Sequence, residues 1–116
     1  FMNNCQNYNR KLMRNIFMEY RIEYSPNSEN HLRKLTTNQQ VIILDTIDKQ
    51  LSFQPDIKTR NRKPMRTNPL APWELRIGKF RVYYDFEKIP KPIVCIRAIG
   101  IKERNIVQIG NKEIKL

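Results

Sequence analysis

The sequence is poor in the residues that link small proteins covalently or through metal ions. Its 116 residues include two cysteines and one histidine, too few for a disulfide framework or a Cys/His zinc site. No apolar run is long enough to span a membrane, and no signal-peptide core is visible. We therefore expect a cytoplasmic protein that holds no metal ion or cofactor and is stabilised by one apolar core.

Acidic residues are also scarce relative to basic ones. The chain contains 11 Asp and Glu against 22 Lys and Arg, which gives a net charge of +11. Basic residues concentrate between positions 58 and 81, where Glu74 is the lone acid. This imbalance indicates a polyanionic partner, namely nucleic acid, an acidic protein segment or a membrane surface.

Three consecutive strands are predicted in the second half of the chain. Trp73–Ile77 and Phe80–Glu87 alternate apolar and polar residues with a period of two, and the two residues between them are typical of a tight hairpin. In the second strand, Arg81, Tyr83 and Asp85 form the polar face. Residues 93–99 are apolar almost throughout, as in a central strand covered on both faces, with Cys95 as a small buried side chain.

Two helices are predicted before these strands. After a strand over residues 19–24, Ser25 and Pro26 are typical of a helix start, and Leu32 and Leu35 are its inward residues. The single histidine, His31, lies beside them, and we expect it to be structural.

The second helix is predicted to begin with a capping box formed by Thr37 and Gln40. Its inward residues are then Val41, Leu44, Ile47 and Leu51. Residues 55–72 follow as a long loop with a basic centre at 58–66, a length typical of functional loops.

The two ends of the chain lead to different predictions. Residues 1–17 show no apolar period, and we expect a disordered or non-native extension, with Met18 as a natural start. Residues 106–109 and 112–116 flank a Gly110-Asn111 turn and predict a closing hairpin. Residues 18–116 are thus expected to form one α+β domain of order βααβββ plus this hairpin. Its two helices would pack on one face of a small curved, mostly antiparallel sheet.

The motifs W-E-L-R-I-G-K-F-R-V-Y-Y-D and A-I-G-I-K-E-R, separated by an apolar strand, resemble the RelE/ParE superfamily of bacterial toxins. With the two helices, the resemblance covers about residues 18–109. It implies a RelE-like fold and the toxin role in a type II toxin–antitoxin module, with a cognate antitoxin and RNA as partners and no membrane. The ribonuclease branch of the superfamily cleaves messenger RNA without metal, typically on the ribosome, and so inhibits translation. In that reaction the ribose 2′-hydroxyl attacks the adjacent phosphate.

The resemblance also implies a set of site residues. Arg81 matches the main catalytic arginine, and Lys102 matches a second arginine. Arg76 and Glu74 are further catalytic candidates from the strand pattern itself, because they share a polar face one strand earlier. Glu74 could act as a base there, and the alternative is a surface pair with Arg76. Arginine suits a phosphate site because its planar fork binds two oxygens and keeps its charge. For RNA binding we expect the remaining basic residues of the loop and strand ends, namely Arg62, Lys63, Arg66, Lys79 and Arg104.

Two departures from the family pattern keep alternatives open. Gln108 stands where the ribonucleases usually have a histidine or tyrosine, and Pro72 and Glu74 stand where one member has paired lysines. Glutamine exchanges no proton near neutral pH. A ParE-like toxin that inhibits DNA gyrase, or a non-toxic binder of nucleic acid or antitoxin, therefore remains as an alternative to the ribonuclease.

Overall fold

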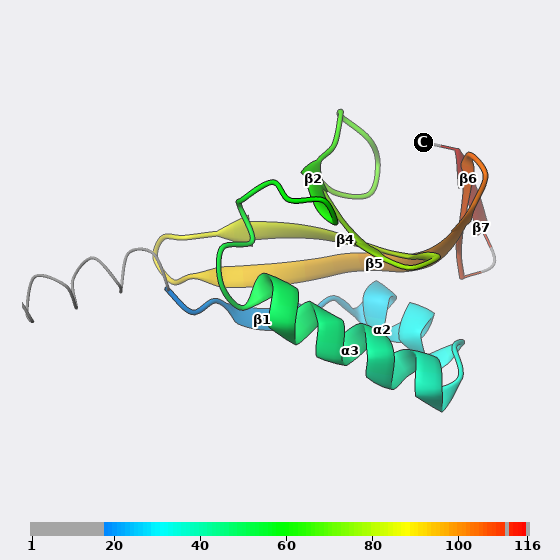
Figure 1. Cartoon of the computed structure of the whole chain (residues 1–116), viewed down its shortest axis with the longest axis horizontal. Helices are drawn as coiled ribbons and strands as arrows, with labels where there is room; N and C mark the ends of the chain where they lie inside the picture. The colour runs from blue at the N-terminus through cyan, green and yellow to red at the C-terminus, as the bar shows by residue number, and fades with distance from the viewer. Residues whose placement is uncertain (1–17, 111, 116) are drawn as a thin grey trace, which may run out of the picture.

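A computed structural model describes residues 18–110 and 112–115, and it has the predicted α+β class and order of elements with one additional short strand, β2 (Figure 1). The expected extension at residues 1–17 lies outside the described residues. The elements in chain order are β1 (Arg21–Tyr24), α2 (Pro26–Arg33), α3 (Thr37–Leu51), β2 (Arg62–Pro64), β3 (Trp73–Ile77), β4 (Phe80–Glu87), β5 (Ile93–Glu103), β6 (Ile106–Ile109) and β7 (Lys112–Lys115).

The strands form one sheet in the order β2-β3-β4-β5-β6-β7, with antiparallel neighbours throughout. β1 pairs parallel to the first half of β5, and β6 pairs with its far end. β5 is 11 residues long and continues beyond the predicted end at residue 99, which is why it has two neighbours along one edge. The prediction of a mostly antiparallel sheet is confirmed.

The helices begin where local chemistry satisfies their first amides. The Ser25 hydroxyl accepts a hydrogen bond from the Ser28 amide at 3.1 Å, as predicted for an N-cap. The predicted capping box of α3 is wrong by one residue, because Thr36 and Gln39 form it, with reciprocal bonds of 3.2 and 3.1 Å. The sequence Thr-Thr-Asn-Gln-Gln fits the motif in two frames, and the structure uses the first.

The inward face of α3 also differs from the prediction. Ile43, Ile47 and Leu51 are fully buried, and Leu44 packs against the same cluster. Val41 is 50% exposed, so its assignment to the core is wrong. Four consecutive apolar residues, 41–44, fit more than one helical phase, and packing against the sheet selects among them.

The sheet lies between the helices on one side and the β2 loop and β6–β7 hairpin on the other (Figure 1), with a large apolar cluster on the helix side and a small one on the other. Both helices lie on one face, where they cover the larger cluster, which includes Leu75, Val82, Tyr84, Val94 and Ile96. On the opposite face the loop around β2 and the hairpin β6–β7 rise from the sheet. They cover a smaller cluster of Ala71, Tyr83, Ala98, Val107 and Ile109.

The structure also corrects three further expectations. Tyr83, predicted on a polar face, is fully buried, since the small cluster covers it. The segment 55–72 is not wholly a loop, because β2 within it pairs with β3. Cys95 is only half-buried. Within the described residues, no helix is long and apolar enough to cross a membrane.

Candidate active site

Glu74 is the centre of the candidate site. It lies on β3, on the face opposite the helices, directly across from Lys63 of β2 and Tyr83 of β4. Its side chain is only 1% exposed. A carboxylate removed from water in this way requires charged or hydrogen-bonding partners.

Three cations supply these partners. The Glu74 Oε1 atom lies 3.2 Å from Nε of Arg76, 3.9 Å from Nε of Arg81 and 4.0 Å from Nζ of Lys63. The hairpin register places Arg76 opposite Arg81, so both guanidinium groups reach the carboxylate from neighbouring strands. The Glu74–Arg76 pair was predicted, but as a surface pair. Its carboxylate is buried because β2 and the following loop cover β3.

Arg81 is held more firmly than the sequence indicates. Its Nη1 atom donates to the carbonyl oxygens of Gly78 at 2.7 Å and Phe80 at 2.9 Å. Its Nε atom is buried and meets no hydrogen-bond acceptor within the described residues at bonding distance. The side chain is 14% exposed. Arg81 therefore adds positive charge beside Glu74, while one nitrogen of its guanidinium group is already hydrogen-bonded to the hairpin turn.

Tyr83 is a component that the sequence analysis did not single out. Its hydroxyl is buried close to the Glu74 carboxylate and meets no acceptor in good hydrogen-bond geometry among the described residues. Loss of water contact, followed by the nearby Glu74 carboxylate, raises the pKa of Tyr83, so the phenol keeps its proton near neutral pH. The signal was present in the alternation of β4, which puts Tyr83 on the same face as Arg81.

A cleft of about 530 Å³ opens over this face. Glu74 and the basic residues Lys63, Arg66 and Lys102 line it, together with the rest of the segment 64–69. The structure thus brings together two predicted catalytic residues, Glu74 and Lys102, and two predicted RNA-binding residues. Arg76 and Arg81 contact the same carboxylate from the side.

Arg62 does not join this surface. It is 8% exposed, and its Nη1 atom donates to the carbonyl oxygens of Gln50 at 2.6 Å and Gln54 at 2.9 Å. These carbonyls lie at the end of α3, where a cation is favourable. Arg62 therefore ties the basic loop to the helix and does not face a ligand.

The remaining residues that the sequence analysis discussed lie outside the Glu74 cleft. Lys79 is exposed on the hairpin turn, with its ammonium group 5.7 Å from the centre of the Phe80 ring. Arg104 is exposed in the turn between β5 and β6, with φ of 58°. Gln108 is exposed on β6 and donates to Glu113 at 3.1 Å. None of the three lines the Glu74 cleft.

The chemistry available is that of a carboxylate and several cations. Within the described part of the chain, no group of three His, Cys, Asp or Glu side chains gathers where a metal ion could bind. A carboxylate can accept the proton of a hydroxyl group that comes within hydrogen-bond distance of it. Fixed cations nearby then stabilise the negative charge that develops on the reacting molecule.

The order of the elements and the curved sheet define a RelE-like α+β fold, as comparison with solved structures shows. A chain in the crystal structure of the toxin–antitoxin complex RelBE2 from Mycobacterium tuberculosis is similar to it, with a TM-score of 0.62 and 20% sequence identity. The match covers 72% of this chain and 92% of that chain. At this identity the likeness establishes the fold. No protein-family model and no curated protein matches the sequence.

Proposed function

We propose that this protein is the toxin of a type II toxin–antitoxin module and acts in the cytoplasm as a metal-independent messenger-RNA endoribonuclease. The observation that carries the proposal is the buried carboxylate of Glu74, with Arg76, Arg81 and Lys63 around it at the base of a basic cleft. A RelE-like fold supports the same assignment and a cognate antitoxin as partner. The net charge of +11 supports RNA as substrate.

The proposed reaction uses the RNA as its own nucleophile. The Glu74 carboxylate takes the proton of a ribose 2′-hydroxyl, the 2′-oxygen bonds to the adjacent phosphorus, and the bond from phosphorus to the 5′-oxygen breaks. The leaving 5′-oxygen takes a proton from the Lys102 ammonium group. The products are a 2′,3′-cyclic phosphate and a 5′-hydroxyl, and both side chains recover their protonation from water.

The cations have a second part in this scheme. Negative charge increases on the phosphate oxygens as the new bond forms, and fixed positive groups are most effective there because they need no reorganisation. Arg81 and Arg76 supply this positive charge, and they also hold the Glu74 carboxylate in place. Lys63 and Arg66 bind the flanking strand from the cleft wall.

One observation favours a non-toxic binder as the second candidate. The Nη1 atom of Arg81 already donates to two carbonyl oxygens, which leaves less of the fork for a phosphate. Gln108, which is paired with Glu113, offers no exchangeable proton. A binder would retain RNA affinity and cleave nothing.

Expression from a tightly controlled promoter tests the proposal. The wild type should arrest growth and produce new messenger-RNA ends, and Arg81→Ala should lower cleavage by about 10²-fold, as for loss of one electrostatic stabiliser. Arg81→Lys should recover part of this loss, because an ammonium group cannot replace the fork. Lys49→Ala, at an exposed position on α3, is the control and should cleave like the wild type. Arrest without new RNA ends, accompanied by DNA damage signalling, would contradict the ribonuclease and favour a gyrase inhibitor.

A further inference from the structure

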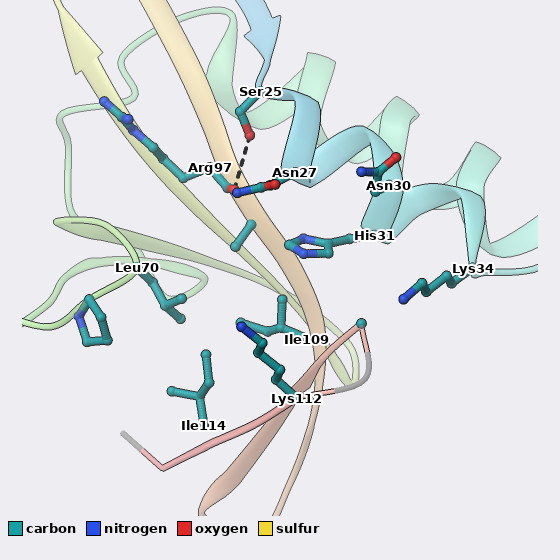
Figure 2. Close-up of a pocket in the computed structure, with 13 residues that line it drawn as sticks. Ser25, Asn27, Asn30, His31, Lys34, Leu70, Arg97, Ile109, Lys112 and Ile114 are labelled. Atoms are coloured by element: carbon teal, nitrogen blue, oxygen red, sulfur yellow. Dashed lines mark hydrogen bonds between the residues drawn. The ribbon is translucent and has the colours of Figure 1, made fainter.

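A second basic pocket lies between α2 and the hairpin β6–β7, beside the part of β5 that lies between its pairings with β1 and with β6. Its volume is about 630 Å³, and Ala98, Ile109 and Ile114 contribute apolar atoms to its lining. Figure 2 shows His31 from α2, Lys34 from the C-cap of α2 and Lys112 from β7 directed into the space between the helix and the hairpin. Its walls therefore come from parts of the chain more than 70 residues apart.

The pocket has the charge of an anion site. Lys34 and Lys112 line it together with the amide side chains of Asn27 and Asn30. Arg97 lines it as well, but its Nη2 atom lies 3.6 Å from Oδ2 of Asp85, which offsets part of its charge. Among the described residues that line it, none is acidic. In this respect it differs from the cleft, where Glu74 offsets part of the positive charge.

His31 adds a directed donor. Its Nδ1 atom accepts a hydrogen bond from the Ile99 amide at 3.2 Å, so the ring hydrogen of the neutral imidazole is on Nε2. Partial burial, followed by the charge of Lys34, lowers the pKa of His31 and favours this neutral form. Lys34 itself lies over the hairpin turn, since a Cβ atom built on Gly110 would be 3.4 Å from its Nζ.

The pocket and the cleft belong to one continuous surface. Both include Pro69 in their lining. A third hollow joins them, since it shares Arg66 and Asn68 with the cleft and Leu70 and Arg97 with the pocket. A single strand that enters the cleft can therefore follow the 65–72 segment to the pocket.

We propose that this pocket binds a backbone phosphate of single-stranded RNA, on a nucleotide flanking the one whose phosphate lies in the Glu74 cleft. Lys34 and Lys112 contact the phosphate from opposite walls, and His31 donates from Nε2. The assignment of the ligand as RNA rests on the proposed function of the cleft. A phosphate fits better than a lone carboxylate because every nucleotide of a bound strand carries one, and the pocket lies on the strand's path.

A binding assay separates this inference from catalysis. The probe is a single-stranded decanucleotide with 2′-O-methyl riboses, which cannot be cleaved, and its affinity is measured by fluorescence anisotropy over a salt series. The log–log slope for single-stranded RNA changes by about 0.7 units per phosphate contact, so Lys34→Ala/Lys112→Ala, which removes the contact with one phosphate, should flatten the slope by about 0.7 units. Lys49→Ala/Lys91→Ala removes the same charge from exposed positions outside both pockets and should leave the slope unchanged.

A dinucleotide of the same chemistry, which has a single phosphate and places it in the cleft, should bind equally to the wild type and both double variants. A pocket variant that matches the control on the decanucleotide would overturn the inference. So would a variant that binds the decanucleotide normally but loses affinity for polyglutamate, because the pocket would then accept an acidic peptide. Tighter binding of a mononucleotide 5′-phosphate than of the decanucleotide would point to a free nucleotide and overturn it as well. Failure of the wild type to cleave RNA would contradict the proposed ribonuclease activity. The salt dependence of binding would still test the phosphate pocket, because the probe is not cleaved.

Discussion

The two faces of the sheet are built on opposite principles. The face under α2 and α3 is covered by apolar side chains, with Ile43, Ile47 and Leu51 fully buried. The opposite face has a small apolar cluster beside a buried carboxylate, three cations and a buried tyrosine hydroxyl. Apolar burial stabilises the fold, whereas the second face keeps polar groups out of water at a cost in free energy. The difference indicates which face is specialised for binding and chemistry.

The largest effect on stability is expected on the helix-covered face. Ile47→Ala leaves a cavity under α3 and should lower the free energy of unfolding by about 2–5 kcal/mol. Chemical denaturation measures it. Val41→Ala, at an exposed position of the same helix, is the control and should change stability by less than about 1 kcal/mol. Equal losses in the two variants would contradict the observed phase of α3.

Removal of the central carboxylate should affect function more than folding. Glu74→Gln keeps the shape but loses the charge that faces Arg76 and Arg81, and we expect a stability loss of about 1–3 kcal/mol. Cleavage of RNA should fall by about 10²-fold or more, since the general base is lost. Paired measurements of unfolding and initial cleavage rate test both parts. An active Glu74→Gln variant would exclude this residue as the base.

Two adjacent tyrosines allow the faces to be compared by the loss of a single oxygen atom. The Tyr84 hydroxyl, on the helix-covered face, donates to the Pro55 carbonyl at 2.7 Å, so Tyr84→Phe should cost about 1 kcal/mol. The Tyr83 hydroxyl lies near Glu74 without good hydrogen-bond geometry within the described residues, and Tyr83→Phe should cost less than Tyr84→Phe. Urea midpoints of the two variants measure the difference. A larger loss from Tyr83→Phe would show that its hydroxyl is paired in solution.

The smallest expected effect is the pH dependence contributed by His31. Its pKa is lowered from the ordinary value of 6.5, so the folded protein binds this proton less readily than the unfolded chain. Its contribution to stability is present above pH 6.5 and is lost as pH falls below that value towards the lowered pKa. His31→Asn keeps an acceptor for the Ile99 amide and removes the titration, so its melting temperature should fall less over this range. Identical pH profiles would exclude the effect.

Local features of the fold were predictable from the sequence. The period of two located β3 and β4 at their observed bounds, and Ser25-Pro26 located the start of α2. The frame of the capping box and the phase of α3 were not predictable. The Thr-Thr and Gln-Gln pairs, and four consecutive apolar residues, satisfy the same local rules in more than one way, and packing decides among them.

Membership of the site could be predicted from the sequence only for residues whose place is determined by the register of the hairpin strands. Glu74, Arg76 and Arg81 were placed on one polar face by their spacing in the hairpin, and the structure brings all three together. Arg62 has the same sequence character as Lys63, yet its guanidinium group is bound by carbonyls at the end of α3. Nothing near Arg62 in the sequence indicates that contact.

The sequence by itself thus determined the α+β class, the excess of positive charge and the faces of the hairpin strands, because these depend on composition and on neighbours a few residues apart. Only the tertiary structure decided that Glu74 is buried, that Arg62 is withdrawn from the surface, and that Lys34 meets Lys112 across a pocket. Each of these depends on contacts between separate elements, such as β2 paired beside β3 or the hairpin against α2. Burial and electrostatic environment are properties of those contacts, and no local pattern encodes them.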